Sequence, residues 1–209
     1  LFFLKIQKEG IKMSFIHESA VRSMSEYESR TLQDMSLYTQ LAAPDTPNGE
    51  RFQEVFASAL PLTEGLSATG LLRSPQVDTV AVFTDGLFIG NFAALPGEES
   101  VLLFFLALGE NTASRGYAGR LLSGIRKEYP HQQIIIPVEK GSENDGYDGL
   151  LNSNQALFLR NGYRASGCLL TCLGREYRLL CSNGELRAEP LEKLLEKAGA
   201  SFSLTLKNS

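Results

Sequence analysis

The residues best suited to do chemistry lie between positions 104 and 122. An apolar run over 104–108 leads through a short polar loop into Gly116-Tyr117-Ala118-Gly119 and then into a helical pattern. The first amide N–H groups of a helix have no partner within it, so a helix start without bulky side chains can bind phosphate oxygens. Arg115 adds a positive charge suited to the same oxygens. Tight packing of a strand against a helix would need the same small residues, so the turn alone leaves both interpretations open.

The spacing and the composition exclude several classes of protein. No Gly-Lys-Ser/Thr follows Gly116, which excludes a Walker loop, and the glycines do not form the dinucleotide pattern G-x-G-x-x-G. The chain has 209 residues, of which 43% are hydrophobic and 21% charged, as in ordinary globular proteins. Its net charge of -4 argues against a nucleic-acid partner bound mainly through phosphates. The apolar stretch over 1–4 is too short for a membrane span, so we expect a cytoplasmic protein with no membrane partner.

The cysteines and histidines indicate neither a disulfide framework nor a metal site. Cys168, Cys172 and Cys181 are odd in number, have no paired spacing and lie in apolar, strand-like runs. We therefore expect them to be thiols of the core in a reducing compartment. His17 and His131 are far apart in the sequence, and we expect no metal.

Hydrophobic periodicity and turn residues predict the elements that position the turn at Gly116. Helices are expected over 28–41 and 50–60, then a loop rich in Gly and Ser, and later helices from the Gly116 turn to before Pro130, from Asn152 or Asn154 to Asn161-Gly162, and over 189–198. Strands are expected over 79–83, 87–95, 101–108, 133–139, 163–173, 176–181 and 202–206, with a hairpin turn at Asp85-Gly86. The nearly continuous apolar run over 101–108 is typical of a central strand buried on both faces.

These elements predict an α/β (α+β) fold, with a mixed, mostly antiparallel central sheet flanked by helices. We expect a single domain over 26–209, preceded by an N-terminal extension over 1–25. Within that extension two alternatives stay open. Residues before Met13 are a leader, or residues 2–6 supply a first edge strand.

Two segments resemble the GNAT superfamily of N-acetyltransferases. The acetyl-coenzyme A loop of that superfamily is Gln/Arg-x-x-Gly-x-Gly/Ala, and this chain has Ala113-Ser114-Arg115-Gly116-Tyr117-Ala118. Ala113 replaces Gln or Arg, which removes one pyrophosphate contact that Arg115 or Arg120 could supply. Downstream, the stretch over 154–163 resembles the later helix of the family, with Gly162-Tyr163 in the Gly-Phe place. A final hairpin and helix, over 173–180 and 189–197, resemble the ending of a bacterial subgroup.

The resemblance implies a cofactor site for acetyl-CoA as co-substrate. Family members splay the strands equivalent to 101–108 and 133–139, and the pantetheine arm lies between them. Backbone groups of Leu106, Ala107 and Leu108 would then bond the arm and polarise the acetyl carbonyl. The pyrophosphate would be held by Ser114, Arg115, Gly116, Tyr117, Ala118 and Gly119. Asn154 and Phe158 would complete the site, and Phe158 stands where many members carry the tyrosine that protonates the departing thiolate.

The resemblance also implies the reaction, transfer of an acetyl group to a primary amine of a small molecule or peptide. Phe104 and Pro137 occupy places where the related subgroup has carboxylates, which leaves Glu139 as the candidate base. The alternative interpretation of Glu139 is that it is only the polar end of a strand. The same departures allow an alternative, a catalytically silent acyl-CoA-binding or interaction module. The strand over 202–206 could pair with a second copy of the chain in a homodimer.

Overall fold

The computed structural model describes residues 37–58, 67–109, 112, 116–139, 153–172, 175–198 and 202–205. The strands are β1 (Leu37–Leu41), β2 (Asp78–Thr84), β3 (Leu87–Pro96), β4 (Ser100–Leu108), β5 (Gln133–Glu139), β6 (Arg164–Cys172), β7 (Arg175–Cys181) and β8 (Phe202–Thr205). The helices are α2 (Pro47–Ser58), α3 (Ala68–Arg73), α4 (Tyr117–Glu128), α5 (Ser153–Arg160) and α6 (Ala188–Ala198).

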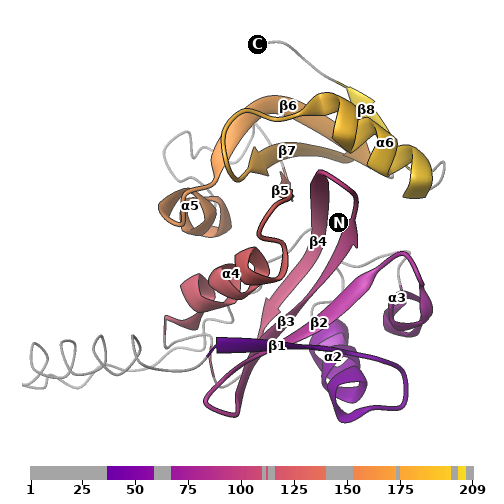
Figure 1. The fold of residues 1–209 in the computed structure, drawn as a ribbon, viewed down its shortest axis with the longest axis vertical. Helices are drawn as coiled ribbons and strands as arrows, with labels where there is room; N and C mark the ends of the chain where they lie inside the picture. Colours follow the sequence, from indigo (N-terminus) through magenta and orange to yellow (C-terminus); the bar gives the residue numbers. More distant parts are fainter. Residues whose placement is uncertain are drawn as a thin grey trace, which may run out of the picture.

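The described strands form one eight-stranded sheet in the order β1-β2-β3-β4-β5-β7-β6-β8. Every neighbouring pair is antiparallel except β4 and β5, which are parallel. The mixed, mostly antiparallel sheet predicted from the sequence is therefore confirmed. In Figure 1, β1 to β3 lie at the bottom, β6 to β8 at the top, and β4 and β5 between them.

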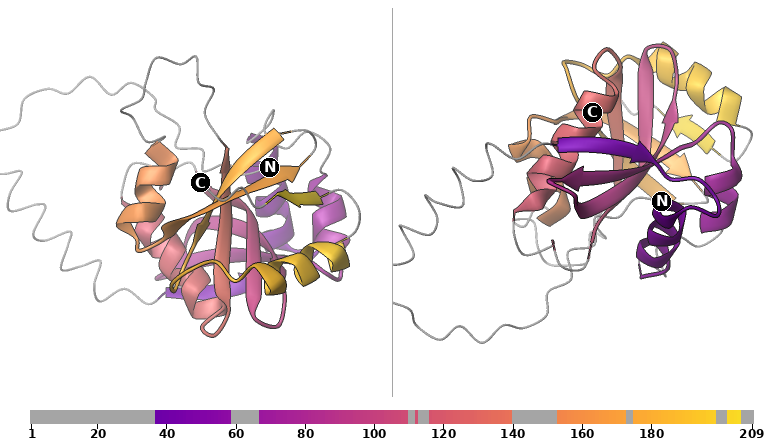
Figure 2. Two further views of the ribbon diagram at one scale, coloured as in Figure 1. Left: turned by 90° about the horizontal axis from the view of Figure 1, so that it is seen from above. Right: turned by 60° about the horizontal axis from the view of Figure 1, so that its bottom comes forward.

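Helices cover the sheet on both faces (Figures 1 and 2). On one face, which we call the α4 face, Leu121 and Ile125 of α4 and Phe158 of α5 share a buried cluster with Val82, Phe92, Leu103 and Leu106. On the other face, which we call the α2 face, Phe52 and Phe56 of α2 pack with Leu71 and Leu72 of α3 against Ala93, Phe105 and Ala107. Leu191 and Leu194 of α6 cover the same side of the sheet further along, over Leu102, Ile135 and Leu179.

Burial on both faces explains the apolar sequence of β4. Val101 and Leu103 contribute to the α4 face, and so do Leu106 and Leu108. The side-chain parity changes between Leu103 and Leu106 because the register of β3 with β4 shifts between Ala93 and Ala94. The shift leaves Phe104, which is half-buried, in contact with both clusters on the opposite face.

The helix predicted over 28–41 is wrong for its last five residues, which form β1. These residues pair antiparallel with β2, from Leu37 opposite Thr84 to Leu41 opposite Val80. Leu37, Tyr38 and Leu41 fit both a helical stripe and an edge strand, and the pairing with β2 decides between them. The part of the expectation over 28–36, like the alternatives within 1–25, lies outside the described residues.

A helix also occupies part of the predicted Gly/Ser-rich loop. The side chain of Ser67 caps α3 by accepting a hydrogen bond from the amide of Gly70, at 2.9 Å. Leu71 and Leu72 then anchor the helix in the cluster on the α2 face. Ser67 followed by two leucines was therefore a helix signal that the surrounding glycines and serines obscured.

Most other predicted elements are confirmed. The Asp85-Gly86 turn has positive φ at both residues, 47° and 77°, as the favoured two-residue hairpin requires. β5 has its predicted bounds, and α5 ends at Asn161-Gly162, where Gly162 is left-handed. Asn154 is the second residue of α5 rather than its cap, and Asn152 lies outside the described residues. The C-terminal strand β8 pairs with β6 of the same chain.

Cys181 is fully buried, Cys168 is half-buried, and both are free thiols, which agrees with the predicted core role for Cys181. The side chain of Cys172 lies outside the described part. Among the described residues, no group of three or more His, Cys, Asp or Glu side chains is placed to hold a metal ion. None of the described helices combines the length and the apolar character needed to cross a membrane.

Candidate functional site

The central feature of the sheet is that β4 and β5 separate soon after they meet. They pair only from Ser100 opposite Gln133 to Leu102 opposite Ile135. Beyond that point β4 stays with β3 as far as Leu108, whereas β5 stays with β7 as far as Glu139. The sheet therefore divides into two halves joined by a short parallel contact. The expected splaying of these two strands is confirmed.

The separation leaves main-chain groups of β4 facing the gap. The amide of Gly109 donates to the carbonyl of Ile89 on β3, at 3.1 Å. Successive residues of a strand direct their main-chain groups to opposite edges, so Phe105 and Ala107 also bond toward β3. Leu106 and Leu108 then direct their N–H and C=O groups toward β5, which has already turned away. Of the three predicted backbone positions, Leu106 and Leu108 can bond a ligand in the gap and Ala107 cannot.

Helix α4 starts at the same end of the sheet as this open edge. Gly116 precedes the helix in the left-handed conformation, with φ 74°, and no side chain caps the helix start. Chain neighbours aside, a Cβ atom added at Gly116 would meet no atom of the described residues within 4 Å. None of the described side chains therefore covers the first amides of α4, which can donate to an anion.

The other small residues of the turn serve packing as well. A Cβ atom on Gly119 would lie 3.2 Å from Oδ1 of Asn161, so Gly119 lets α4 approach the end of α5. Tyr117 is 6% exposed, and its ring belongs to the core of the α4 face. Ala118 is half-buried. The packing interpretation therefore applies to Gly119 and Tyr117, and phosphate binding at Gly116 stays a prediction.

Thr112 ties down the segment between β4 and α4, a role that the sequence did not indicate. Its Oγ1 lies 2.9 Å from the carbonyl oxygen of Ile89 and 2.7 Å from that of Gly109. Its amide donates to the same Gly109 carbonyl, at 3.0 Å. Thr112 thereby links the end of β4 to β3 just before the chain turns toward α4.

The predicted cationic side chains are only partly described. Arg120 lies in the first turns of α4 and donates to Oγ1 of Thr84 at the end of β2, at 3.3 Å. Ser114 and Arg115 lie outside the described residues, as do the side chains of Asn154 and Glu139. Their predicted roles stay predictions. The backbone of Glu139 is described and is paired with Tyr177 of β7.

Phe158 and Tyr163 form a buried aromatic pair at the end of α5. Phe158 is 4% exposed, and its ring packs edge-on against that of Tyr163 at a centroid distance of 5.8 Å. Arg126 lies over the Tyr163 ring, 5.0 Å from its centroid. Burial raises the pKa of Tyr163 to about 12, against the opposing effects of the charge and the hydrogen bonding of Arg126. The Tyr163 hydroxyl is therefore neutral at physiological pH.

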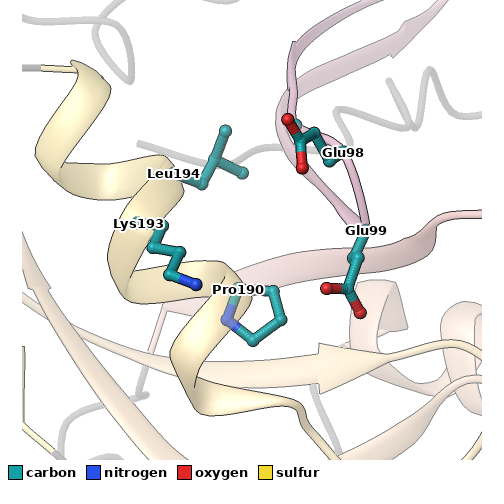
Figure 3. A pocket seen from close by; sticks show the side chains of 6 residues that line it. Glu98, Glu99, Pro190, Lys193 and Leu194 are labelled. Atoms are coloured by element: carbon teal, nitrogen blue, oxygen red, sulfur yellow. The ribbon is translucent and has the colours of Figure 1, made fainter.

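A separate cavity of about 230 Å³ lies between the β3–β4 turn and α6 (Figure 3). Glu98 and Glu99 line one wall, and Pro190, Lys193 and Leu194 line the other. Glu99 pairs with Arg187 at 2.9 Å, and Lys193 pairs with Glu189 at 2.7 Å, all on exposed side chains. The cavity lies at the end of β4 opposite to Leu108, away from the open edge.

No protein-family model and no curated protein sequence matches the chain. Solved structures do match it. A protein from Bacteroides thetaiotaomicron assigned to the GNAT family of acetyltransferases has a TM-score of 0.58 and 17% identity, over 77% of this chain and 94% of that one. An aminoglycoside 6′-N-acetyltransferase complexed with coenzyme A has a TM-score of 0.54 and 15% identity, over 69% and 95% of the two chains. The aminoglycoside 6′-N-acetyltransferase from Enterococcus faecium has a TM-score of 0.52, with the same identity and coverage. At these identities the similarity establishes the fold.

The raised pKa of Tyr163 predicts a pH dependence of stability. Because the folded protein holds the phenol proton more tightly than the unfolded chain, whose tyrosine pKa is about 10, the stabilisation is complete below about pH 10 and is lost as the pH rises through 12. The free energy of unfolding, measured with urea, should therefore fall across this range by about 2–3 kcal/mol more in the wild type than in Tyr163→Phe. Equal losses in the two proteins would contradict a buried, neutral phenol.

Proposed function

We propose that this chain, whose fold is that of the GNAT N-acyltransferases, transfers an acetyl group from acetyl-CoA to a primary amine of a small molecule or peptide. The observation that carries the proposal is the parting of β4 and β5 after Leu102 and Ile135, beside a helix start without a side-chain cap at Gly116. An extended chain with amide groups fits the first feature and a diphosphate fits the second. Coenzyme A combines both.

The open edge of β4 suits the pantetheine arm of coenzyme A. An extended ligand beside a strand can use its main-chain groups in the way that another strand would. Leu106 and Leu108 offer two such positions, spaced as in a ladder. The side chains of Leu106 and Leu108 are buried in the core of the α4 face, so the strand is held rigidly while its edge stays free to bond.

The start of α4 suits the diphosphate. The N-terminus of a helix carries partial positive charge, and its first amides point outward. Gly116 has no side chain to obstruct the approach of a phosphate group. Because the whole chain carries a net charge of -4, this local positive field must hold the anionic ligand, and Arg115 would add to it.

The same edge would also contribute to the chemistry. Acetyl-CoA supplies an activated acetyl thioester. A β4 amide directed into the gap can donate to the acetyl carbonyl oxygen, where negative charge develops as the amine attacks. We propose that Glu139 accepts the amine proton, because Phe104 and Pro137, at the positions where carboxylates were expected, have no ionisable group. Phe158 has no proton to donate to the departing thiolate, so a bound water would fill that role.

The phosphate-binding assignment is tested by Gly116→Leu, with Gly86→Leu as its matched control. Both glycines are left-handed, with φ 74° and 77°, and neither would have an atom within 4 Å of an added Cβ. The two substitutions therefore impose similar backbone strain, of about 1–2 kcal/mol. Calorimetry should show acetyl-CoA affinity reduced about tenfold or more in Gly116→Leu only. Equal affinities in the two variants would contradict the assignment.

The base assignment is tested by Glu139→Gln, with the exposed Glu196→Gln on α6 as control. We expect kcat to fall about 100-fold or more at neutral pH in Glu139→Gln, with little change in acetyl-CoA affinity. The rate is followed as the free thiol of coenzyme A that appears when acetyl-CoA reacts with each of a panel of primary amines. Full activity in Glu139→Gln would refute this role. Binding of acetyl-CoA by the wild type without turnover of any amine would favour the catalytically silent module.

A further inference from the structure

Asn91 is a buried carboxamide that the fold does not use. It lies in the middle of β3, its side chain is fully buried, and neither Oδ1 nor Nδ2 has a hydrogen-bond partner within the described part of the chain. Leaving a buried polar group without a partner is unfavourable, and an apolar side chain of the same shape would be tolerated better. By contrast, the buried carboxamide of Gln133 is fully bonded, to the carbonyls of Ser182 and Glu185 and to the amide of Arg187.

The surroundings of Asn91 are small and apolar. Its register partners are Ala81 on β2 and Ala107 on β4, and Ala93 follows two positions later on the same strand. Because Ala93 and Ala107 belong to the cluster of the α2 face, Asn91 lies on that face too. Asn91 is therefore flanked by three small side chains, and the ring of Phe105, opposite Ala93, lies diagonally beside it.

Asn91 also lies close to the open edge of β4. Its partner Ala107 stands between Leu106 and Leu108, the two residues whose main-chain groups face the gap. Asn91 is therefore one strand spacing, about 5 Å, behind the edge proposed to bind coenzyme A. It lies on the face opposite to α4, so the phosphates held by α4 and the Asn91 carboxamide are on different sides of the sheet.

We infer that Asn91 selects the acceptor amine by bonding a neutral polar group, a hydroxyl or carboxamide, on the body of that amine. The inference rests on the proposed acetyltransferase function. A carboxamide offers both hydrogen-bond donors and acceptors, and so does a hydroxyl or carboxamide group on the acceptor, so the two can bond each other. Asn91 is fully buried and its register partners are the alanines Ala81 and Ala107, so a second charged group on the acceptor would lose its hydration there without a charged register partner. Neutral polar amines are thus the expected acceptors.

Acceptor binding at Asn91 requires movement of α2. Phe52 and Phe56 of α2 pack on the alanines beside Asn91 and on Phe105, with ring centroids 5.5 Å and 5.1 Å from that of Phe105. A ligand can reach the carboxamide only when these rings move away from β3 and β4. The unbonded carboxamide favours this movement, because the closed arrangement leaves it unsatisfied.

The test uses Asn91→Leu, with Gln133→Met as the matched control. Asn91→Leu should raise the midpoint of thermal unfolding by about 2 °C or more, because it removes two unsatisfied polar atoms. Gln133→Met should lower the midpoint, because it breaks three hydrogen bonds. A lower midpoint for Asn91→Leu would show that the carboxamide is satisfied in solution, by a bound water for example, and would overturn the inference.

The second measurement compares two acceptor amines, glycinamide and isobutylamine. Glycinamide carries a carboxamide where isobutylamine carries an isopropyl group of similar shape. The ratio of their kcat/KM values should fall about tenfold or more from the wild type to Asn91→Leu, and comparing the ratio between variants cancels the intrinsic reactivities of the amines. Acetyl-CoA affinity should stay within twofold. An unchanged ratio, or turnover of neither amine by wild type that binds acetyl-CoA, would overturn the inference. If the wild type does not bind acetyl-CoA, the proposed function is refuted instead. The unfolding midpoints would then still test whether the Asn91 carboxamide is unsatisfied.

Discussion

The arrangement of this protein depends on the limited pairing between β4 and β5. A buried strand normally satisfies its main-chain groups on both sides, and an unpaired edge inside a sheet is unfavourable. Here the parallel contact ends after three residue pairs, because β5 follows β7 and β4 follows β3. Among the described strands, the remainder of β4 is bonded on one edge only. The binding of an extended ligand at that edge would restore the missing hydrogen bonds.

In the proposed enzyme, one face of the sheet would bind the phosphates of the cofactor and the other would bind the acceptor. On one face, α4 begins with Gly116 and directs its first amides toward the end of β4. On the other, α2 and α3 cover Asn91 and Phe105 with an apolar layer. In the proposed arrangement, the anionic part of the cofactor and the acceptor would lie on opposite faces beside the same edge. The register shift beside Ala93 assigns Phe104 to the α2 face.

The sequence predicted the elements whose signals are local. The Asp85-Gly86 turn, the bounds of β5 and the doubly buried β4 each rest on a few adjacent residues. It failed for β1 and α3, because the edge strand is defined by its partner β2 and the helix by a single capping serine. The resemblance predicted a backbone site at Leu106 to Leu108, but separating Leu106 and Leu108 from Ala107 required the register of β3 with β4. Asn91 carried no sequence signal, since a buried carboxamide is recognised only by the absence of partners.

The most direct test of the coenzyme A slot is residue-level amide hydrogen exchange in the presence and absence of coenzyme A. If the pantetheine arm lies along β4, exchange at Leu106 or Leu108 should slow by about tenfold or more, because their amides face the gap in the free protein. The amide of Ala107, which already faces β3, should change much less. Binding of coenzyme A that leaves the exchange of Leu106 and Leu108 unaltered would contradict the account.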